Sequence, residues 1–218
     1  MGKTNLSPKI SNHLETNIGK VIIFCEGKTE KYYFEYLAES IKKNKYNEIT
    51  IILQQANGNA RTVLNYANKF LLNEENTSRF RTYKKYLVFD CDDPTDIQDV
   101  IQNANDNYTT EDFYELLISN YSFETWLLMH FENIKSILSK RDILIHLETH
   151  INKSYKKANK GTIREIIKEG NIQKAIENAK VLEKFFIEND KNILSDIQDM
   201  NPYTIVHKLV EEFLKFIS

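Results

Sequence analysis

The sequence VIIFCEGKTEKYYFEYL, residues 21–37, joins a continuous apolar run to an amphipathic pattern through one acidic residue and one glycine. A short run rich in Val and Ile is typical of a strand buried on both faces. After a turn at Gly27, apolar residues recur at helical spacing, and Thr29 is a suitable cap for that helix. Glu26 is therefore expected at the carboxyl end of a buried strand, where it either caps the helix or takes part in chemistry.

The alternation of strand and helix continues to residue 132. Further strands are predicted at 49–53, 85–89 and 114–118, with amphipathic helices between them. This order predicts an α/β fold with a mainly parallel sheet flanked by helices. We expect residues 1–18 to form an N-terminal tail and residues 19–132 to form the α/β domain.

Beyond the fourth predicted strand, the pattern becomes helical. Residues 133–218 are therefore predicted to form an all-helical C-terminal region. The apolar spacing predicts helices at 134–138, 142–151, 162–168, 172–186 and 202–217. For the last of these, Asn201 is the expected cap and Pro202 the first helical residue.

Composition limits the classes of function. The formal net charge of -2 means that any polyanion binding must use a local patch, a metal ion or a partner. No apolar run approaches the roughly 20 residues that span a bilayer, and the polar N-terminus lacks a signal-peptide core. The two cysteines, Cys25 and Cys91, follow strand-like runs and suggest a reducing compartment. We therefore expect a cytoplasmic protein without a membrane association.

Acidic residues follow two of the predicted strands. Glu26 follows the first, while Asp90, Asp92 and Asp93 follow the third in FDCDD. Ligands of parallel α/β sheets bind beyond the carboxyl ends of the strands, and residues i and i+2 of an extended chain project to one side. Because clustered carboxylates repel one another, the three aspartates are predicted to bind a divalent cation, Mg²⁺ or Mn²⁺. The Asp-x-Asp spacing also occurs in phosphatases and glycosyltransferases.

Two further glutamates are candidates for the same site. Glu30 lies one helical turn beyond Glu26, where it faces the site or stabilises the helix dipole. Glu124, in the apolar segment SFETWLLMHF, is either a metal ligand, a partner of a basic residue or part of a helix start that Ser122 caps.

A basic segment lies in the helical region. KSYKKANKGTIR contains no acidic residue, and its cations are Lys153, Lys156, Lys157, Lys160 and Arg164. Such a patch would attract a phosphate backbone towards the metal. A solvated helix end explains the same charges nearly as well.

The order of the acidic residues resembles the Toprim fold of topoisomerases, primases and related nucleases. More narrowly, EGKTEKYYFEYL, LVFDCDD, SNYSFETWLLMHFEN, AIENAK and NPYTIVHKLVEEF together resemble the RloB family, a Toprim-like group of prokaryotic proteins. These blocks run from about residue 20 to the C-terminus. The resemblance implies that Asp90 and Asp92 hold Mg²⁺, that Glu26 is a general acid or base, and that Lys156 or Lys157 stabilises transition-state charge.

The resemblance also implies a biological role. Members of the family occur in abortive-infection and other phage-defence loci, often beside an AAA or ABC-type ATPase. The expectation is a Mg²⁺-dependent nuclease that acts on DNA or RNA, tRNA included, with a partner ATPase. EGKTE lacks the upstream glycine of a Walker A motif, so the chain is not expected to hydrolyse ATP itself. The sequence leaves the oligomeric state open.

Two other functions are compatible with the same residues. VFDCDDPT is similar to the Asp-x-Asp-x-Thr motif of haloacid-dehalogenase-like phosphatases, in which Asp90 would be the nucleophile and Asp92 the acid/base. The threonine is one position late, however, and that motif normally ends the first strand. Alternatively, the chain is a non-catalytic regulatory or scaffold subunit of an ATPase complex, in which the acidic pocket acts only as a switch.

Overall fold

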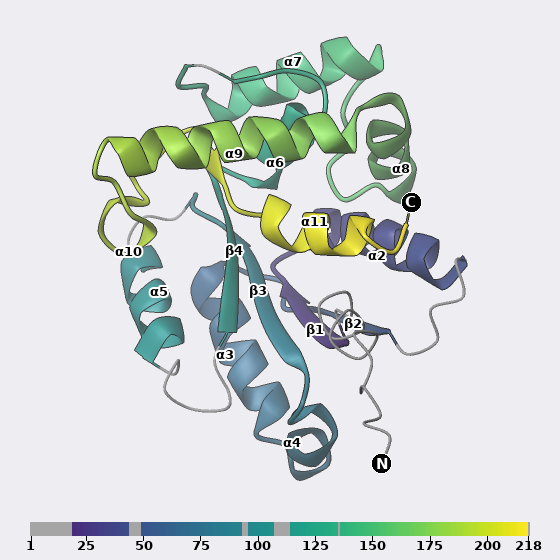
Figure 1. Cartoon of the computed structure of the whole chain (residues 1–218), viewed down its shortest axis with the longest axis vertical. Helices are drawn as coiled ribbons and strands as arrows, with labels where there is room; N and C mark the ends of the chain where they lie inside the picture. The colour runs from purple at the N-terminus through teal and green to yellow at the C-terminus, as the bar shows by residue number, and fades with distance from the viewer. Residues whose placement is uncertain (1–18, 44–48, 93–95, 107–113, 135, 218) are drawn as a thin grey trace, which may run out of the picture.

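The core of the molecule is a five-stranded sheet with the strand order β2-β1-β3-β4-β5. The computed structural model describes residues 19–43, 49–92, 96–106, 114–134 and 136–217 (Figure 1). The strands are β1 (Lys20–Cys25), β2 (Thr50–Gln55), β3 (Lys84–Asp90), β4 (Tyr114–Asn120) and β5 (Tyr203–Thr204). The first four are parallel and β5 runs antiparallel to β4.

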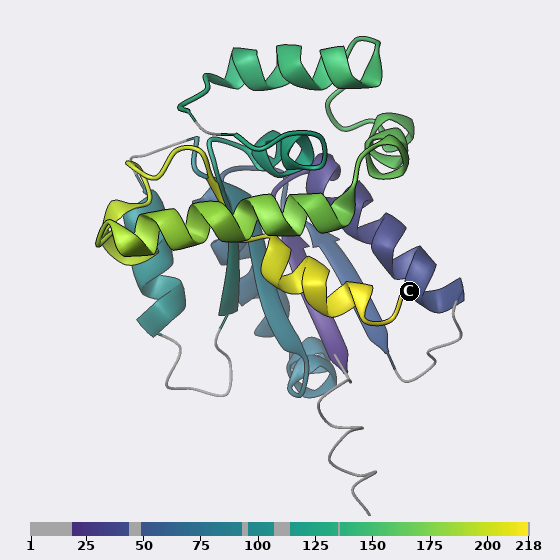
Figure 2. The same cartoon turned by 45° about the horizontal axis from the view of Figure 1, so that its top comes forward.

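Helices surround this sheet. Within the described ranges they are α2 (Lys28–Lys43), α3 (Ala60–Leu71), α4 (Glu74–Phe80), α5 (Ile97–Asp106), α6 (Phe123–Met129), α7 (Lys140–Ile151), α8 (Lys160–Glu169), α9 (Ile172–Glu188), α10 (Ile193–Asp196) and α11 (His207–Leu214). Helices α7 and α8 lie at the upper end of the molecule in both Figure 1 and Figure 2. The prediction of an α/β fold with a mainly parallel sheet flanked by helices is confirmed.

Both faces of the sheet are buried, which explains the continuous apolar run in β1. Val21 and Ile23 belong to the hydrophobic cluster that includes α2, α6, α9 and α11. Ile22 and Phe24 belong to the cluster on the opposite face, with α3 and α5. Because successive residues of a strand point to opposite faces, two covered faces require apolar residues at every position.

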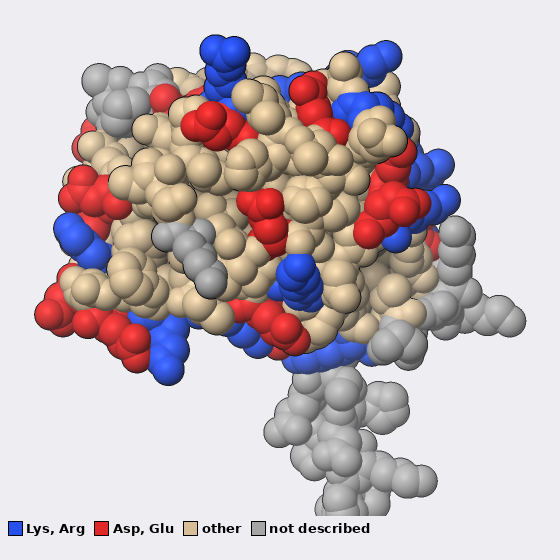
Figure 3. Space-filling view, turned by 90° about the horizontal axis from the view of Figure 1, so that it is seen from above, with Lys and Arg blue, Asp and Glu red and all other residues tan. Residues whose placement is uncertain are grey.

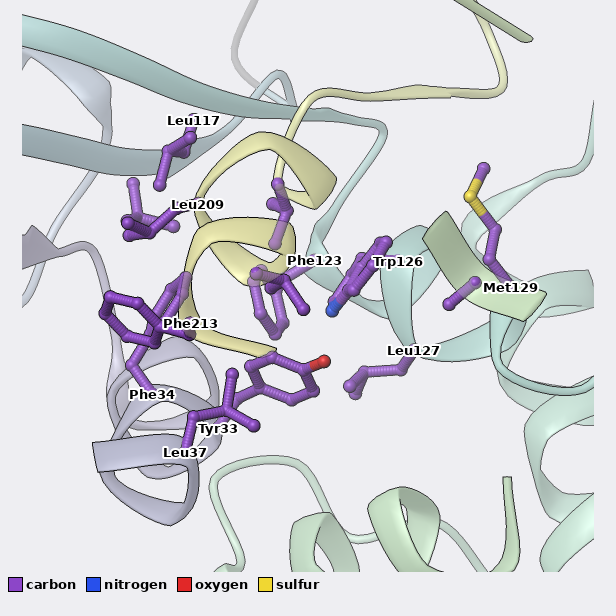
Figure 4. Packing of buried hydrophobic residues seen from close by; sticks show 14 of the residues in the cluster. Tyr33, Phe34, Leu37, Leu117, Phe123, Trp126, Leu127, Met129, Leu209 and Phe213 are labelled. Carbon is purple, nitrogen blue, oxygen red and sulfur yellow. The ribbon is translucent and has the colours of Figure 1, made fainter. Parts of the chain in front are cut away.

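Aromatic side chains join α2 to α6 and α11 (Figure 4). The Tyr33 ring of α2 meets Phe123 and Trp126 of α6 edge to face, with ring centroids 5.5 Å and 6.0 Å away. Phe34 of α2 meets Phe213 of α11 in the same way at 6.3 Å. Such pairs add to the area that they bury, so α6 and α11 are packed into the same core as β1 and α2.

The C-terminal region contains one strand in addition to its helices. The prediction of a helix starting at Pro202 was wrong at its start, because β5 precedes α11. Thr204 pairs with Ser119, and the backbone N–H of Ile205 donates to the carbonyl of Ile118 at 3.1 Å. Without β5, the backbone N–H and C=O groups at the edge of β4 would lack partners. The extended segment at residues 203–205 supplies partners for some of these groups.

Residues 134 and 136–138 also differ from the sequence prediction, because they form no helix. Ile134 is buried and 3 % exposed, whereas Ile137 is 75 % exposed, so these two apolar residues do not share a buried helical face. The short helix α4 was not predicted, since its sequence EENTSRF buries only Phe80. In the described part of the chain, no helix combines the length and the apolar character needed to cross a bilayer.

Candidate active site

The ends of β1 and β3 bring Glu26 and Asp90 together. Glu26 follows β1 directly, and its backbone N–H donates to the carbonyl of Val88 at 3.0 Å. The backbone N–H of Asp90 in turn donates to Oε2 of Glu26 at 3.0 Å. The Glu26 side chain therefore reaches across to the neighbouring parallel strand and does not cap α2.

Asp90 performs the capping role that the sequence predicted for Ser122. Its Oδ1 accepts the backbone N–H of Phe123, the first residue of α6, at 2.7 Å. Ser122 makes no side-chain capping bond, and its buried hydroxyl has no partner among the described residues. The positive end of the α6 dipole thus helps to hold a carboxylate that is only 4 % exposed.

Glu30 has the structural role that the sequence offered as one alternative. Helix α2 begins at Lys28, and Oε2 of Glu30 accepts the backbone N–H of Gly27 at 3.0 Å, as in a capping box. Thr29 was predicted as the cap but lies inside the first turn. Its hydroxyl oxygen accepts the backbone N–H of Ala158 at 3.1 Å instead. Glu30 is nevertheless buried close to the other acidic residues.

Glu124 is a buried carboxylate that accepts a hydrogen bond from Tyr155, a residue that was not among the predicted site residues. The Tyr155 hydroxyl donates to Oε1 of Glu124 at 2.9 Å. Oε2 is buried and has no hydrogen-bond partner in the described part of the chain. Tyr155 belongs to the sequence KSYKK, in the segment between α7 and α8. The path of this segment places the Tyr155 side chain next to Glu124 of α6.

The carboxylates of this site perturb one another electrostatically. The pKa of Glu26 is raised to about 7, mainly by burial and in smaller part by the charges of Glu30 and Asp92, while the backbone N–H of Asp90 opposes the shift. Burial and the charge of Glu124 likewise raise the pKa of Glu30 to about 7. The pKa of Asp90 lies well above its usual range because of burial and the same acidic neighbours. A cation would relieve this repulsion.

Lys157 is the lysine that lies near the acidic cluster. Partial burial lowers the pKa of its ammonium group, but nearby carboxylates outweigh this effect and raise the pKa above its usual value. These carboxylates belong to Glu124, Asp90, Glu30 and Glu26. Lys156, the other lysine suggested by the resemblance, is exposed like Lys157, but it is not among the residues that line the pocket beside Glu26 and Glu30, whereas Lys157 is. Of the two, Lys157 is therefore the residue with a direct electrostatic link to the site.

An open pocket of about 400 Å³ lies beside Glu26 and Glu30. The start of α2, the loop after β2 and the segment before α8 form its walls, and Gln55, Asn57 and Lys157 are among its lining residues. Asp90 borders a narrower depression with Arg61. Gln55 and Asn57 were not predicted as site residues, although their position at or just beyond the carboxyl end of a strand in the parallel sheet was the available signal.

The predicted trio of aspartates is not a compact group in the described residues. Asp90 ends β3 and is buried, whereas Asp92 lies at the surface, with Oδ2 3.0 Å from the Nζ of Lys140. Asp92 is still near enough to influence Glu26. Asp93 lies outside the described residues.

Most cations of the basic segment form ion pairs with acidic residues. The ion pairs are Lys153 with Glu165, Lys160 with Glu35 and Glu39, and Arg164 with Glu39. In the face shown in Figure 3, Lys and Arg form small groups near Asp and Glu and make no broad basic area. The positive charge that the segment has in sequence is therefore partly offset in space.

The donor atoms of the acidic cluster fit a hard divalent cation. Mg²⁺ commonly uses one or two carboxylates and completes its coordination with water and substrate phosphate oxygens. Among the residues that the structure describes, no three His, Cys, Asp or Glu side chains form a ready metal cage. The mutually repelling carboxylates and the unpartnered oxygen of Glu124 suit an ion that takes its other ligands from water and substrate.

Comparison with known proteins identifies one family. A family model described as RloB-like protein matches residues 21–213. This match runs from β1 into α11 and includes Glu26, Asp90, Glu124 and Lys157. No curated protein and no solved structure matches the chain.

Proposed function

The chain belongs to the RloB-like protein family, and from its acidic site we propose that it is a Mg²⁺- or Mn²⁺-dependent nuclease of the Toprim type. The observation that carries the proposal is the contact between Glu26 and the backbone of Asp90 across adjacent parallel strands. This contact places two poorly solvated carboxyl groups at the edge of the sheet where ligands of α/β proteins bind.

Each residue of the site has a role in this proposal. Asp90 and Asp92 would bind the divalent cation, which would polarise a phosphate and neutralise its developing charge. Glu26, with a pKa of about 7, exchanges a proton near neutral pH and suits a general acid or base. Lys157 remains protonated because of the surrounding carboxylates, and its ammonium group would stabilise charge on the phosphate.

The biological setting is proposed from the family resemblance. We propose an effector of antiphage defence that acts in the cytoplasm on DNA or RNA, tRNA included, together with an AAA or ABC-type ATPase. The absence of a Walker A motif from EGKTE is consistent with a separate ATPase subunit.

The phosphatase alternative has weaker geometric support. A nucleophilic Asp90 would need an accessible oxygen, yet this carboxylate is 4 % exposed and one of its oxygens accepts the Phe123 N–H. Asp92 pairs at the surface with Lys140 and would have to leave this ion pair in either mechanism. The nuclease proposal uses Asp90 as a ligand, for which a buried and oriented carboxylate is well suited.

Cleavage assays with alanine variants test the proposed function. Labelled DNA, RNA and tRNA would be incubated with Mg²⁺ or Mn²⁺, with and without the proposed partner ATPase. We expect Asp90→Ala to lower the cleavage rate at least about 100-fold, because the metal would lose a ligand, and Asp92→Ala to lower it as well. Asp199→Ala, which removes an exposed carboxylate paired with Lys191, is the matched control and should leave the rate unchanged.

Two results would overturn the proposal. One is metal-dependent cleavage that persists in both the Asp90→Ala and Asp92→Ala variants. The other is the absence of cleavage by the wild-type protein on every substrate, with either metal and with the ATPase present. A phosphoaspartate trapped at Asp90 would favour the phosphatase alternative instead.

A further inference from the structure

Glu124 is buried, and only one of its two carboxylate oxygens has a hydrogen-bond partner among the described residues. The residue is 1 % exposed, Oε1 accepts the Tyr155 hydroxyl at 2.9 Å, and Oε2 has no partner among the described residues. A buried acceptor without a donor costs roughly 1 to 3 kcal/mol, and more when it is charged. A bound ligand that contacts Oε2 would remove this cost.

The surroundings of Glu124 indicate the chemistry of that ligand. Glu30 and Asp90 lie within electrostatic range of its carboxylate, and so does the ammonium group of Lys157. Three buried carboxylates repel one another, so a cation is favoured over a further anion as the direct partner of Oε2. The oxygen atoms are hard ligands, which Mg²⁺ and Mn²⁺ prefer.

Tyr155 is itself held in place from two sides. Its backbone N–H donates to Oε1 of Glu148 on α7 at 2.9 Å, while its hydroxyl donates to Glu124 on α6. Three residues later, the backbone N–H of Ala158 donates to the Thr29 hydroxyl of α2 at 3.1 Å. The segment between α7 and α8 is thus tied to α2, α6 and α7, and it presents Tyr155 in a defined position.

We propose that Glu124 is a further ligand of the divalent cation and that Tyr155 is its positioning residue, holding Oε1 so that Oε2 binds the ion. This inference rests on the proposed function, because it assigns two more residues to the same metal site. A hydrogen-bond partner that orients a ligating side chain typically changes metal affinity 10- to 100-fold. The helical region therefore contributes to the site through Tyr155.

Direct Mn²⁺ binding tests this inference without the need for a substrate. The free Mn²⁺ concentration would be followed by electron paramagnetic resonance during titration of the whole 218-residue chain. Tyr155→Phe removes only the hydroxyl and should weaken Mn²⁺ binding about 10-fold. Tyr114→Phe is the matched control, since it removes a hydroxyl that donates to Asn68 at 2.7 Å on another part of the sheet, and it should bind Mn²⁺ like the wild type.

A double-mutant cycle separates positioning from a merely structural role. Glu124→Gln retains the side-chain volume and an oxygen for Tyr155, but removes the charge, so it should weaken Mn²⁺ binding at least as much as Tyr155→Phe. Because Tyr155 acts through Glu124, adding Tyr155→Phe to Glu124→Gln should cause no further loss. A loss that is fully additive would overturn the positioning role.

The outcomes distinguish this inference from the proposed function. If Asp90→Asn abolishes Mn²⁺ binding while Tyr155→Phe and Glu124→Gln bind like the wild type, the inference is overturned and the metal site at Asp90 stands. If the wild-type protein binds no Mn²⁺, both are overturned. If Mn²⁺ binds as predicted but no nucleic acid is cleaved, the inference stands and the nuclease proposal fails.

Discussion

Glu26 holds a half-buried carboxyl group beyond β1. Burial is the main cause that raises its pKa from 4.5 to about 7, and the backbone N–H of Asp90 only partly offsets this. Because the folded-state pKa exceeds the unfolded value, protonation stabilises the folded protein. This contribution is fully present below about pH 4.5 and is lost as the pH rises through 7.

Replacing this carboxyl group should therefore stabilise the metal-free protein at high pH. At pH 8 without divalent ions, Glu26→Gln should raise the free energy of unfolding by about 2 kcal/mol, because one pKa unit corresponds to about 1.4 kcal/mol and solvent screens part of the shift. The difference should vanish near pH 4.5. Urea unfolding at both pH values measures it, with the exposed Glu188→Gln as control. A variant less stable than the wild type at pH 8 would contradict the desolvation argument.

The sequence was sufficient to predict part of the site but not all of it. Glu26 and Asp90 were predictable because carboxyl ends of parallel strands lie at one edge of a sheet. Asp92 was expected beside Asp90, but that spacing requires an extended chain, and β3 ends at Asp90. Tyr155 meets Glu124 only through the fold of the helical region, and local periodicity carries no information on such a contact.

Among the helices, α6 and α7 begin with different capping arrangements. Ser139 and Asp142 form a capping box at the start of α7. At the start of α6, the N–H of Phe123 is bound by Asp90 from another element. A serine before an apolar helix is a good capping signal in both sequences, but at α6 a distant carboxylate has taken its place.

The same substitution should thus have different consequences for stability at the two helices. Ser139→Ala should lower the free energy of unfolding by about 1 kcal/mol, the usual cost of a lost cap. Ser122→Ala should be neutral or slightly stabilising, because its buried hydroxyl makes no hydrogen bond in the described structure. Thermal and urea unfolding of both variants would measure the difference. An equal loss in the two variants would show that Ser122 caps α6 after all.

Elements with a strong sequence pattern were predicted best. The strands β1 to β4 read as apolar runs because both faces of the sheet are covered, and their predicted bounds agree with the structure to within about two residues. Helix α4 was not predicted because its sequence is mostly polar. Strand β5 was not predicted because two residues are too few to show a periodic pattern. Strand β5 exists through its pairing with β4, which is a tertiary interaction.

At the scale of the whole molecule, one hydrophobic cluster joins the sheet to the C-terminal helices. It contains Val21 of β1, Tyr33 of α2 and Trp126 of α6, together with Ala179 of α9 and Phe213 of α11. Removing the C-terminal helices would expose the sheet face that they cover. The two regions therefore depend on each other for burial of their apolar surface.

This shared core predicts a single cooperative unfolding transition. Trp126 is the only tryptophan and is fully buried between the two regions, so its fluorescence reports on their contact. Urea curves from tryptophan fluorescence and from far-ultraviolet circular dichroism should coincide. Two separated transitions would contradict the shared core and would indicate that residues 133–218 unfold independently.

The central claim is that the acidic residues beyond β1 and β3 bind a divalent cation. Anomalous diffraction from crystals of this protein soaked in MnCl₂ tests it most directly, because manganese is located without reference to any activity. The account predicts an anomalous peak within coordination distance of a carboxylate oxygen of Asp90. A map with no peak at Asp90, or with manganese bound only elsewhere, would contradict it.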